Sequence, residues 1–222
     1  MAASGADVYS APCLFDRLMC RRISRAMDAG VVEDAEVLDE RMERREDIRR
    51  AAAIEVPASI VREVERTLDG QREMLAGFFG VSLGEREGAG FLRYPAGGFY
   101  APHVDRAHVD SWPAAARRSI ALVVFLTGSR EAEADGTFEG GVLRLFAPRE
   151  TIEIAPRAGL LVAFRADMLH EVTAVRGGAR DAVVDWFYEG EGLSPTEEPE
   201  RTETISHREK EKQRSTEDLS PW

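Results

Sequence analysis

The feature that most constrains the fold of this chain is a series of short apolar segments between residues 91 and 188, separated by Gly, Pro and charged residues. The segments are rich in β-branched and aromatic side chains, which is typical of strands packed into a layered sheet. Regular short strands of this kind predict a jelly-roll barrel, also called a double-stranded β-helix. The predicted strands are Ser119–Leu126, Val142–Phe146, Thr151–Ile154, Leu160–Phe164, Glu171–Val175 and Ala182–Tyr188.

Two segments that precede the strands have helical periodicity instead. Residues 12–29 and residues 58–79 repeat apolar side chains three or four positions apart, which predicts two helices that each present an apolar stripe to the core. We expect both helices to brace one sheet. The predicted fold class is therefore α+β dominated by β, a jelly-roll with two or more N-terminal bracing helices. Val31 to Ala53 is heavily charged and predicts a solvated segment or mobile loop.

Composition changes along the chain predict three parts. Residues 1–89 form a helical and loop region packed on the barrel, and residues 90–190 form the barrel core. Residues 191–222 contain Glu, Thr, Ser and Arg, the lysines Lys210 and Lys212, and almost no aliphatic side chains before Trp222. A segment of that composition cannot bury enough apolar surface to fold, so we expect this tail to be disordered.

The triplet His103-Val104-Asp105 has the His-x-Asp pattern of a candidate metal-binding pair. Residues i and i+2 of a strand point to the same side, so both side chains can reach one metal ion. Two imidazoles and one carboxylate can occupy one face of a six-coordinate iron and leave positions free for small molecules. His170, which opens a run that alternates like a strand, is the candidate third ligand. Alone, the triplet would more often be an ordinary surface loop than a metal site.

A second triplet, His108-Val109-Asp110, competes for the same assignment. We prefer the first, because it directly follows a Tyr-Ala-Pro run and stands nine residues beyond Tyr94. The second lies among residues typical of a loop. It is expected to be solvated or to contact substrate near a cleft.

Several motifs occur in a fixed order around these residues. They are Arg93-Tyr94-Pro95-Ala96-Gly97-Gly98-Phe99-Tyr100-Ala101-Pro102-His103-Val104-Asp105, then Gly140-Gly141-Val142-Leu143, His170-Glu171-Val172, Arg180 and Asp185-Trp186-Phe187-Tyr188. From about Gly90 to Tyr188 the chain resembles the prolyl 4-hydroxylase branch of the iron(II)- and 2-oxoglutarate-dependent dioxygenases. Within that branch it is most similar to the oxygen-sensing prolyl hydroxylases.

The resemblance implies a role for each motif residue. His103, Asp105 and His170 would bind iron(II), and Arg180 would hold the distal carboxylate of 2-oxoglutarate, for which a guanidinium fork is well shaped. Tyr94 would line the cosubstrate pocket. One departure is Phe125, where the oxygen-sensing enzymes usually carry a second tyrosine that binds this carboxylate. Either Arg180 works with fewer partners and 2-oxoglutarate binds less tightly, or a hydroxyl such as that of Thr127 or Thr173 substitutes.

The resemblance also implies the reaction. The expected activity is hydroxylation of an unactivated C–H bond with iron(II), 2-oxoglutarate and O2, with L-ascorbate as an accessory reductant. Related halogenases replace the ligand carboxylate by a small residue, so Asp105 favours hydroxylation over halogenation. The expected substrate is a prolyl residue of a protein or peptide. Asp47-Ile48-Arg49 resembles a mobile-loop segment that covers such a substrate, although Ala51 stands near the place of an acidic loop residue, and a solvated charge run is an equal interpretation.

Two alternatives remain open at this stage. The enzyme could hydroxylate a free amino acid or a natural-product intermediate, for which a small chain suffices. The chain could also be a non-catalytic jelly-roll binding module, but the metal triad together with Arg180 argues against that class. Succinate formation would separate a binding module from both enzymes.

Net charge and hydropathy exclude other partners. The formal net charge is -11, and an acidic chain gains nothing from neutralising a polyanion, so nucleic acid is not an expected substrate. No segment approaches the roughly 20 apolar residues that span a bilayer, and no membrane association is expected. Residues 1–7 lack the basic and apolar stretches of a signal peptide, which predicts a cytoplasmic location. No sequence feature assigns an oligomeric state.

Overall fold

The computed structural model of the protein describes residues 8–34, 48–106 and 113–190. The chain divides into two units, Met1–Glu191 and Gly192–Trp222. The second unit, with the tail that the sequence predicts to be disordered, lies outside the described residues, and so do His108 and Asp110 of the second triplet. Everything below concerns the first unit.

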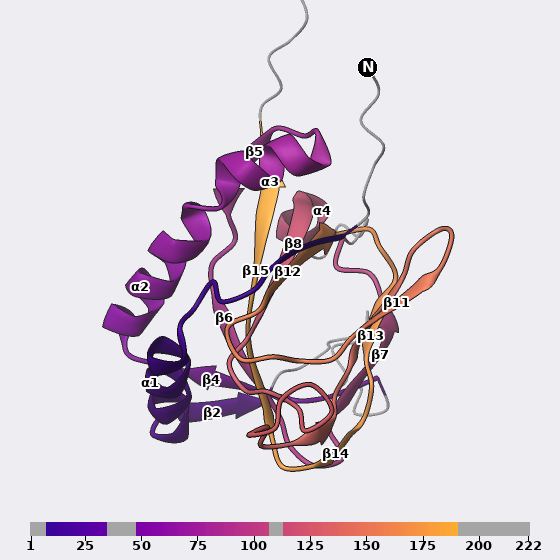
Figure 1. Ribbon diagram of the computed structural model, residues 1–222. Coiled ribbons are helices and arrows are strands. Elements are labelled where there is room, and N and C mark those ends of the chain that lie inside the picture. The colour runs from indigo at the N-terminus through magenta and orange to yellow at the C-terminus, as the bar shows by residue number, and fades with distance from the viewer. Residues whose placement is uncertain (1–7, 35–47, 107–112, 191–222) are drawn as a thin grey trace, which may run out of the picture. The chain divides into compact units, whose positions relative to one another are not determined.

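The larger sheet contains eight strands and forms one layer of a β-barrel (Figure 1). All its pairings are antiparallel. In spatial order its strands are β1 (Val8–Ala11), β12 (Leu161–Arg165), β8 (Arg118–Phe125), β15 (Arg180–Glu189), β6 (Gly90–Tyr94), β4 (Ala52–Glu55) and β2 (Val31–Asp34), with β5 (Leu83–Arg86) also paired to β15.

The second layer is a smaller five-stranded sheet. Its spatial order is β11 (Thr151–Ile154), β10 (Leu143–Phe146), β13 (His170–Val172), β7 (Phe99–His103) and β3 (Arg49–Arg50), and a separate pair joins β14 (Val175–Gly177) to β9 (Glu139–Gly140). The two sheets face each other across a shared interior (Figure 1). The predicted jelly-roll is confirmed, and residues from both sheets line the interior where the candidate site lies.

Alternation along β8 shows why one sequence can serve two cores. Ile120, Leu122 and Val124 are buried in a cluster with the helices, whereas Ala121, Val123 and Phe125 are buried in the barrel interior. Both faces of this strand are apolar because both are covered, so the segment is a continuous hydrophobic run. The same twofold period on β15 sends Val183 and Phe187 to the helix side.

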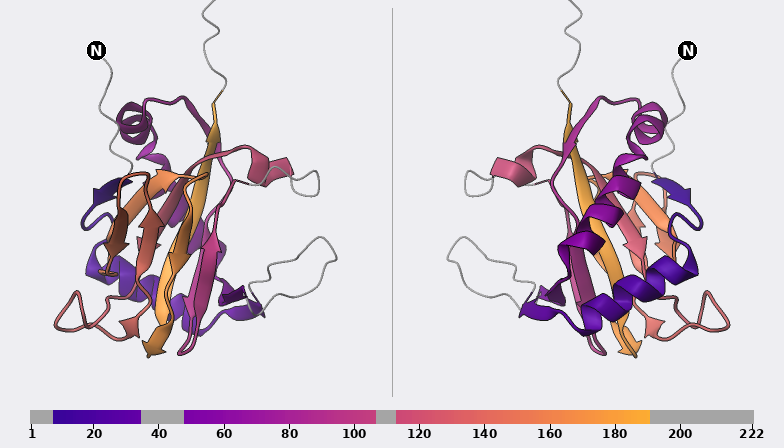
Figure 2. Two further views of the ribbon diagram at one scale, coloured as in Figure 1. Left: turned by 90° about the vertical axis from the view of Figure 1, so that its right-hand side faces the viewer. Right: turned by 90° about the vertical axis from the view of Figure 1, so that its left-hand side faces the viewer.

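Three helices cover the outer face of the larger sheet (Figure 2). They are α1 (Arg17–Asp28), α2 (Ala58–Asp69) and α3 (Arg72–Phe79); a one-turn helix, α4 (Pro113–Ala116), precedes β8. The Asp16 side chain caps α1 by accepting a hydrogen bond from the Met19 amide at 2.7 Å. Ile23, Val64, Leu68 and Leu75 are completely buried against the sheet. The bracing helices are therefore where the apolar stripes predict them.

The helix predicted over residues 58–79 is not continuous. It breaks at Gly70 and Gln71, whose amides bond to the carbonyls of Arg66 and Leu68 before α3 begins at Arg72. Glycine has the highest conformational entropy in the unfolded chain and is a weak helix former, so the polar run around it permits the break. The apolar stripe keeps its phase across the break, which is why periodicity alone does not reveal it.

The segment Val31–Ala53, predicted to be a solvated segment or mobile loop, forms strands at both of its ends, although Val31 and Val32 are exposed. Val31–Asp34 forms β2, Arg49–Arg50 forms β3 and Ala52–Glu55 forms β4. β4 pairs with β6 and β3 pairs with β7, so backbone hydrogen bonds hold these charged residues in the sheets. Residues 35–47 lie outside the described residues.

No helix of the described part of the chain is long and apolar enough to cross a membrane.

Candidate metal centre

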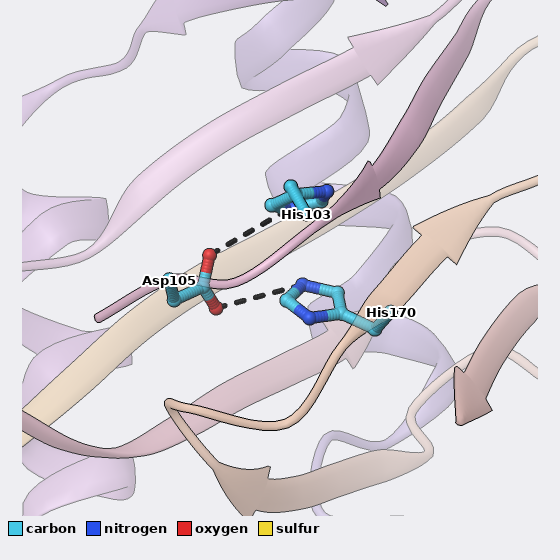
Figure 3. Close-up of side chains that lie close together, drawn as sticks. All are labelled: His103, Asp105 and His170. Atoms are coloured by element: carbon cyan, nitrogen blue, oxygen red, sulfur yellow. Dashed lines mark ion pairs between the residues drawn. The ribbon is translucent and has the colours of Figure 1, made fainter. Parts of the chain in front are cut away.

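The structure brings His103, Asp105 and His170 together, with both imidazoles facing the Asp105 carboxylate (Figure 3). His103 ends β7 and His170 begins β13, and the two residues are direct partners in the antiparallel ladder. One ligand atom from each residue lies within 4.8 Å of the others. The Nε2 atoms of His103 and His170 are each 3.6 Å from a different carboxylate oxygen of Asp105. The three residues that the sequence proposes as ligands therefore converge.

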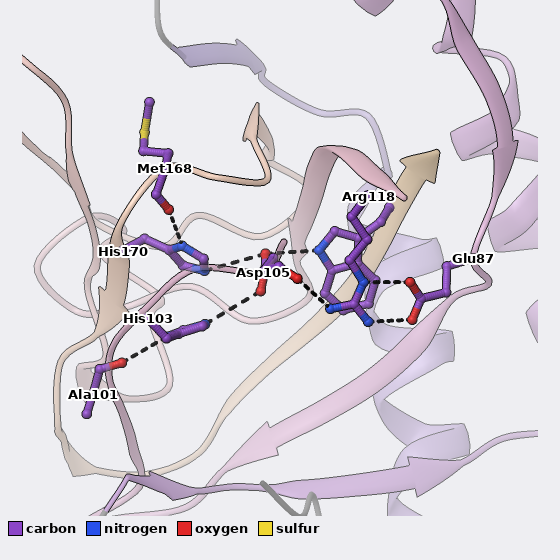
Figure 4. A network of polar contacts seen from close by, with 8 residues as sticks. Glu87, Ala101, His103, Asp105, Arg118, Met168 and His170 are labelled. Atoms are coloured by element: carbon purple, nitrogen blue, oxygen red, sulfur yellow. Dashed lines mark hydrogen bonds and ion pairs between the residues drawn. The ribbon is translucent and has the colours of Figure 1, made fainter. Parts of the chain in front are cut away.

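Both imidazoles are oriented by backbone carbonyls (Figure 4). His103 Nδ1 lies 2.8 Å from the Ala101 oxygen, and His170 Nδ1 lies 2.9 Å from the Met168 oxygen. A carbonyl can only accept, so each Nδ1 carries a proton, and each Nε2 faces Asp105. Burial lowers the pKa of His170, which favours the neutral, ligating form. Such a set of two imidazole nitrogens and one carboxylate fits a divalent iron.

A β-bulge in β7 determines which residues accompany His103. Three steps along β7, from Tyr100 to His103, match only two steps along β13, from Val172 to His170. Pro102 lies within this irregular stretch and has no amide to donate to a ladder. The extra residue interrupts the alternation of side chains between the two faces of the strand. Tyr100 and His103 therefore lie on the same face, although they are three residues apart. Their rings stack with centroids 3.4 Å apart.

Asp105 is held by a network that begins at Glu87 (Figure 4). Trp186 Nε1 donates to Asp105 Oδ2 at 2.9 Å, and Arg118 Nη1 donates to the Asp105 backbone oxygen at 3.1 Å. Arg118 lies 3.7 Å above the Trp186 ring and forms a two-pronged ion pair with Glu87. Burial alone would raise the pKa of Asp105, but the neighbouring His103 and His170 and the hydrogen bond from Trp186 lower it to about 2. Asp105 is thus an oriented carboxylate anion.

Sequence reasoning missed Glu87 and Arg118 as members of this network. Trp186 belongs to the closing Asp-Trp-Phe-Tyr motif, and it lies an even number of residues after Arg180 on one strand. That spacing places both on the same face of β15, a signal that could have assigned Trp186 to the site. No local pattern links Glu87 to Arg118, because the contact joins residues far apart in the sequence.

Arg180 lies in the same cavity as the triad. It is 2% exposed and pairs across the ladder with Tyr94 of β6. Its guanidinium carbon is 5.0 Å from the ring centroids of both Tyr94 and Phe125. Burial lowers the pKa of Arg180 from its usual very high value. Its Nε atom is buried and has no hydrogen-bond partner among the described residues, which leaves a donor for a bound anion.

Gly141 makes room for this arginine. A Cβ atom at Gly141 would lie 3.0 Å from Arg180 Cδ. The φ angle of Gly141 is 61°, in the left-handed region that disfavours residues with a side chain. The cavity that contains Arg180 and the triad has a volume of about 120 Å³. A buried cationic donor that lines the same cavity as the three candidate ligands suits a small keto acid. The residues present therefore fit both iron(II) and 2-oxoglutarate.

Comparison with known proteins agrees with this geometry. A sequence model of the 2OG-Fe(II) oxygenase superfamily matches residues 89–188, the segment that contains the triad, Arg180 and Tyr94. This segment is therefore similar to a 2OG-Fe(II) oxygenase domain. A PKHD-type hydroxylase of Gluconacetobacter diazotrophicus is 34% identical over 98 residues, which cover 43% of this chain and 40% of that protein. The match thus spans well under half of the relative's length.

Solved structures support the fold of the oxygenase domain. A Pseudomonas putida prolyl-4-hydroxylase is similar with a TM-score of 0.64 and 23% identity, over 83% of this chain and 94% of that one. A Trichoplax adhaerens prolyl hydroxylase, solved with a hypoxia inducible factor peptide fragment, has a TM-score of 0.67 and 16% identity, over 82% and 84% of the two chains. The chain is therefore prolyl hydroxylase-like in fold.

Thr127 and Thr173 were the candidates to supply the hydroxyl that Phe125 lacks, but neither residue lines the cavity. The Thr127 hydroxyl accepts from the Asp181 amide at 2.9 Å, and the Thr173 hydroxyl accepts from the Val142 amide at 2.9 Å. Both hydroxyls are engaged in joining strands. Among the described lining residues, the phenols near Arg180 and the triad belong to Tyr94 and Tyr100.

Proposed function

We propose that the protein is an iron(II)- and 2-oxoglutarate-dependent dioxygenase that hydroxylates an unactivated C–H bond. The observation that carries the proposal is the convergence of two Nε2 atoms and one carboxylate in a cavity that also contains the unpartnered Nε of Arg180. A pure binding module has no evident use for three metal-binding side chains and a buried arginine in one cavity. The match to the superfamily over residues 89–188 supports the same activity.

The residues have distinct proposed roles. His103, Asp105 and His170 hold iron(II), while Arg180 binds the distal carboxylate of 2-oxoglutarate beside Tyr94. With both bound, the site would convert 2-oxoglutarate, O2 and a C–H substrate into succinate, CO2 and the hydroxylated product. L-ascorbate is proposed as the reductant that keeps the iron divalent. These roles follow from donor chemistry and from the family resemblance.

The chain itself supplies orientation and a dry environment. Leu143 and Val172 line the cavity with apolar surface, which strengthens the electrostatic interactions made inside it. The network from Glu87 through Arg118 and Trp186 holds the carboxylate of Asp105. Together these residues place substrate and cosubstrate at fixed positions, which is the main catalytic contribution expected of the protein.

A prolyl residue of a protein or peptide is the proposed substrate. Support comes from the likeness in fold to prolyl hydroxylases, one of which is solved with a peptide fragment. A free amino acid or natural-product intermediate is the second candidate. It is favoured by the cavity of about 120 Å³, which is small beside the ~300–1,000 Å³ of typical ligand pockets. Neither proposal involves nucleic acid or a membrane.

We also propose the division into residues 1–89, the oxygenase core 90–190 and the tail 191–222. The N-terminal part contributes strands as well as helices, since β4 extends the larger sheet beside β6. Truncation after residue 190 is expected to leave the thermal unfolding midpoint of the protein unchanged. A fall of that midpoint would assign the tail to the folded core.

The test of the proposed function is succinate formation. The protein is purified without oxygen and given iron(II), 2-oxoglutarate, ascorbate and air, with and without proline-containing peptides and free amino acids. Succinate above the metal-free control, stimulated by one substrate class, is the expected result. Iron binding without succinate from any substrate would count against an oxygenase and favour a binding module.

A further inference from the structure

The cavity carries more positive than negative side chains. Arg49, Arg118 and Arg180 line it, whereas Asp105 is the one acidic residue among the described lining residues. Glu87 compensates Arg118 through their two-pronged ion pair. Iron(II) and a 2-oxoglutarate dianion would cancel each other, and Asp105 balances Arg180. The positive charge of Arg49 is then left over, in a protein whose net charge is -11.

Arg49 is held beside the metal ligands by ring stacking. Its guanidinium carbon lies 4.7 Å from the Tyr100 ring centroid, and the Tyr100 ring stacks on the His103 imidazole with an interplanar angle of 17°. One aromatic ring therefore separates this cation from a proposed iron ligand. The contact fixes the guanidinium and leaves its edge free to bind an acceptor.

The Arg49 edge lacks an acceptor within the described part of the chain. Its Nε atom is buried and has no hydrogen-bond partner there. A buried donor left without a partner is costly, more so on a charged group. The arginines that serve only structure behave differently: Arg93, for example, forms a bidentate pair with Asp181 at 2.7 Å. Arg49 therefore has a buried hydrogen-bond donor that a bound anion would satisfy.

Arg49 and Arg180 approach the cavity from different sheets. Arg49 belongs to β3 at the edge of the smaller sheet and is partly exposed, whereas Arg180 lies on a central strand of the larger sheet and is 2% exposed. The deep arginine suits a cosubstrate that binds first and is then covered. The shallower arginine suits an anion that arrives later, on the substrate.

We propose that Arg49 forms a second anion subsite, which binds a carboxylate of the substrate close to the carbon that is hydroxylated. The substrate class is then a free amino acid, or a peptide with an acidic side chain or a terminal carboxylate beside the target residue. This inference rests on the proposed function and specifies its substrate.

The test compares acid and amide forms of the same ligand by calorimetry. The protein is loaded with manganese(II) and an inert analogue of 2-oxoglutarate, so binding is measured without turnover. The ligand pairs are L-proline with L-prolinamide, and a Pro-Glu peptide with its Pro-Gln counterpart. In the wild-type chain one acid should bind about 10- to 100-fold more tightly than its amide, the usual worth of a charged hydrogen bond.

Variants on one strand assign the preference. Arg49→Gln should reduce the acid-to-amide ratio to about one, and Arg49→Lys should retain part of it because the charge remains. Arg50→Gln is the matched control, since Arg50 is the exposed neighbour on β3, and it should leave the ratio unchanged. Melting curves verify that each variant folds.

The wild-type chain gives a second measurement that needs no variant. The ratio should fall as ionic strength rises, because salt screens a partly exposed charge pair. A ratio near one in the wild type, a ratio retained in Arg49→Gln, or a ratio independent of salt overturns the subsite. Succinate formation is scored separately: equal turnover of acid and amide overturns this inference alone, whereas acid-selective binding without any succinate overturns only the oxygenase.

Discussion

Replacing Trp186 by phenylalanine tests whether the network around Asp105 determines metal affinity. The variant removes the indole N–H that donates to Asp105 Oδ2 at 2.9 Å, and it keeps an aromatic ring under Arg118. The Asp105 side chain is 12% exposed, so water cannot fully replace the lost donor. A hydrogen bond to a charged group contributes about 1.5–3 kcal/mol, which corresponds to a loss of about 10- to 100-fold in iron affinity, as is usual for groups behind a metal ligand.

The assay is anaerobic titration with iron(II) or cobalt(II) in competition with a chelator, alongside thermal melting of the metal-free protein. Tyr188→Phe is the control, because it also removes a polar group from an aromatic side chain of β15, and Tyr188 contacts Arg117 instead of Asp105. Metal affinity within about twofold of wild type in a folded Trp186→Phe protein would refute the reasoning. The carboxylate would then be oriented without a contribution from the indole.

Five further substitutions give four separate predictions. His103→Ala should abolish iron-dependent succinate formation while His108→Ala leaves uncoupled 2-oxoglutarate decarboxylation largely intact; the reverse would move the site to the second triplet. Arg180→Gln should raise the 2-oxoglutarate concentration for half-maximal rate far more than the iron concentration, and an unchanged value would assign the clamp elsewhere. Burial raises the pKa of Tyr100 to about 12. The stabilisation that the neutral phenol gives the folded protein is therefore complete below pH 10 and is lost as pH rises toward 12. Denaturant titrations of Tyr100→Phe should lack this loss, which amounts to about 2–3 kcal/mol in the free energy of unfolding. Gly141→Ala should lower the free energy of unfolding by about 1–3 kcal/mol through its positive φ and its contact with the arginine, and an unchanged denaturation midpoint would show that the cavity wall relaxes.

The sequence predicts the parts of the fold that depend on local pattern. Strand alternation places β8 and β11 within a residue of their observed ends, and apolar stripes reveal the helices. The i, i+2 rule for strands predicts His103 and Asp105 as a ligand pair, although β7 ends at His103 and Asp105 follows the strand. The family resemblance adds His170, which the fold then pairs directly with His103.

Features that depend on distant partners are not predictable in this way. β2 and β4 look like part of a charged, solvated segment, because pairing within the larger sheet orders them and Ile54 is the one residue of β4 that is fully buried. The stacking of Tyr100 on His103 requires a bulge that only the pairing with β13 reveals. Glu87 joins the site through an arginine far along the chain, so no local motif contains the contact.

Two residues with different roles in the candidate site lie on the same strand. Arg180 and Trp186 lie on one face of β15, three two-residue repeats apart, and hydrogen bonds to β6 and β8 lock that strand on both sides. The separation between the cosubstrate clamp and the support of the metal carboxylate is therefore set by backbone geometry. Changes at the rim, where β3 carries Arg49, could alter the choice of substrate without altering that separation. Such a division would let new specificities arise while the oxidation chemistry is preserved.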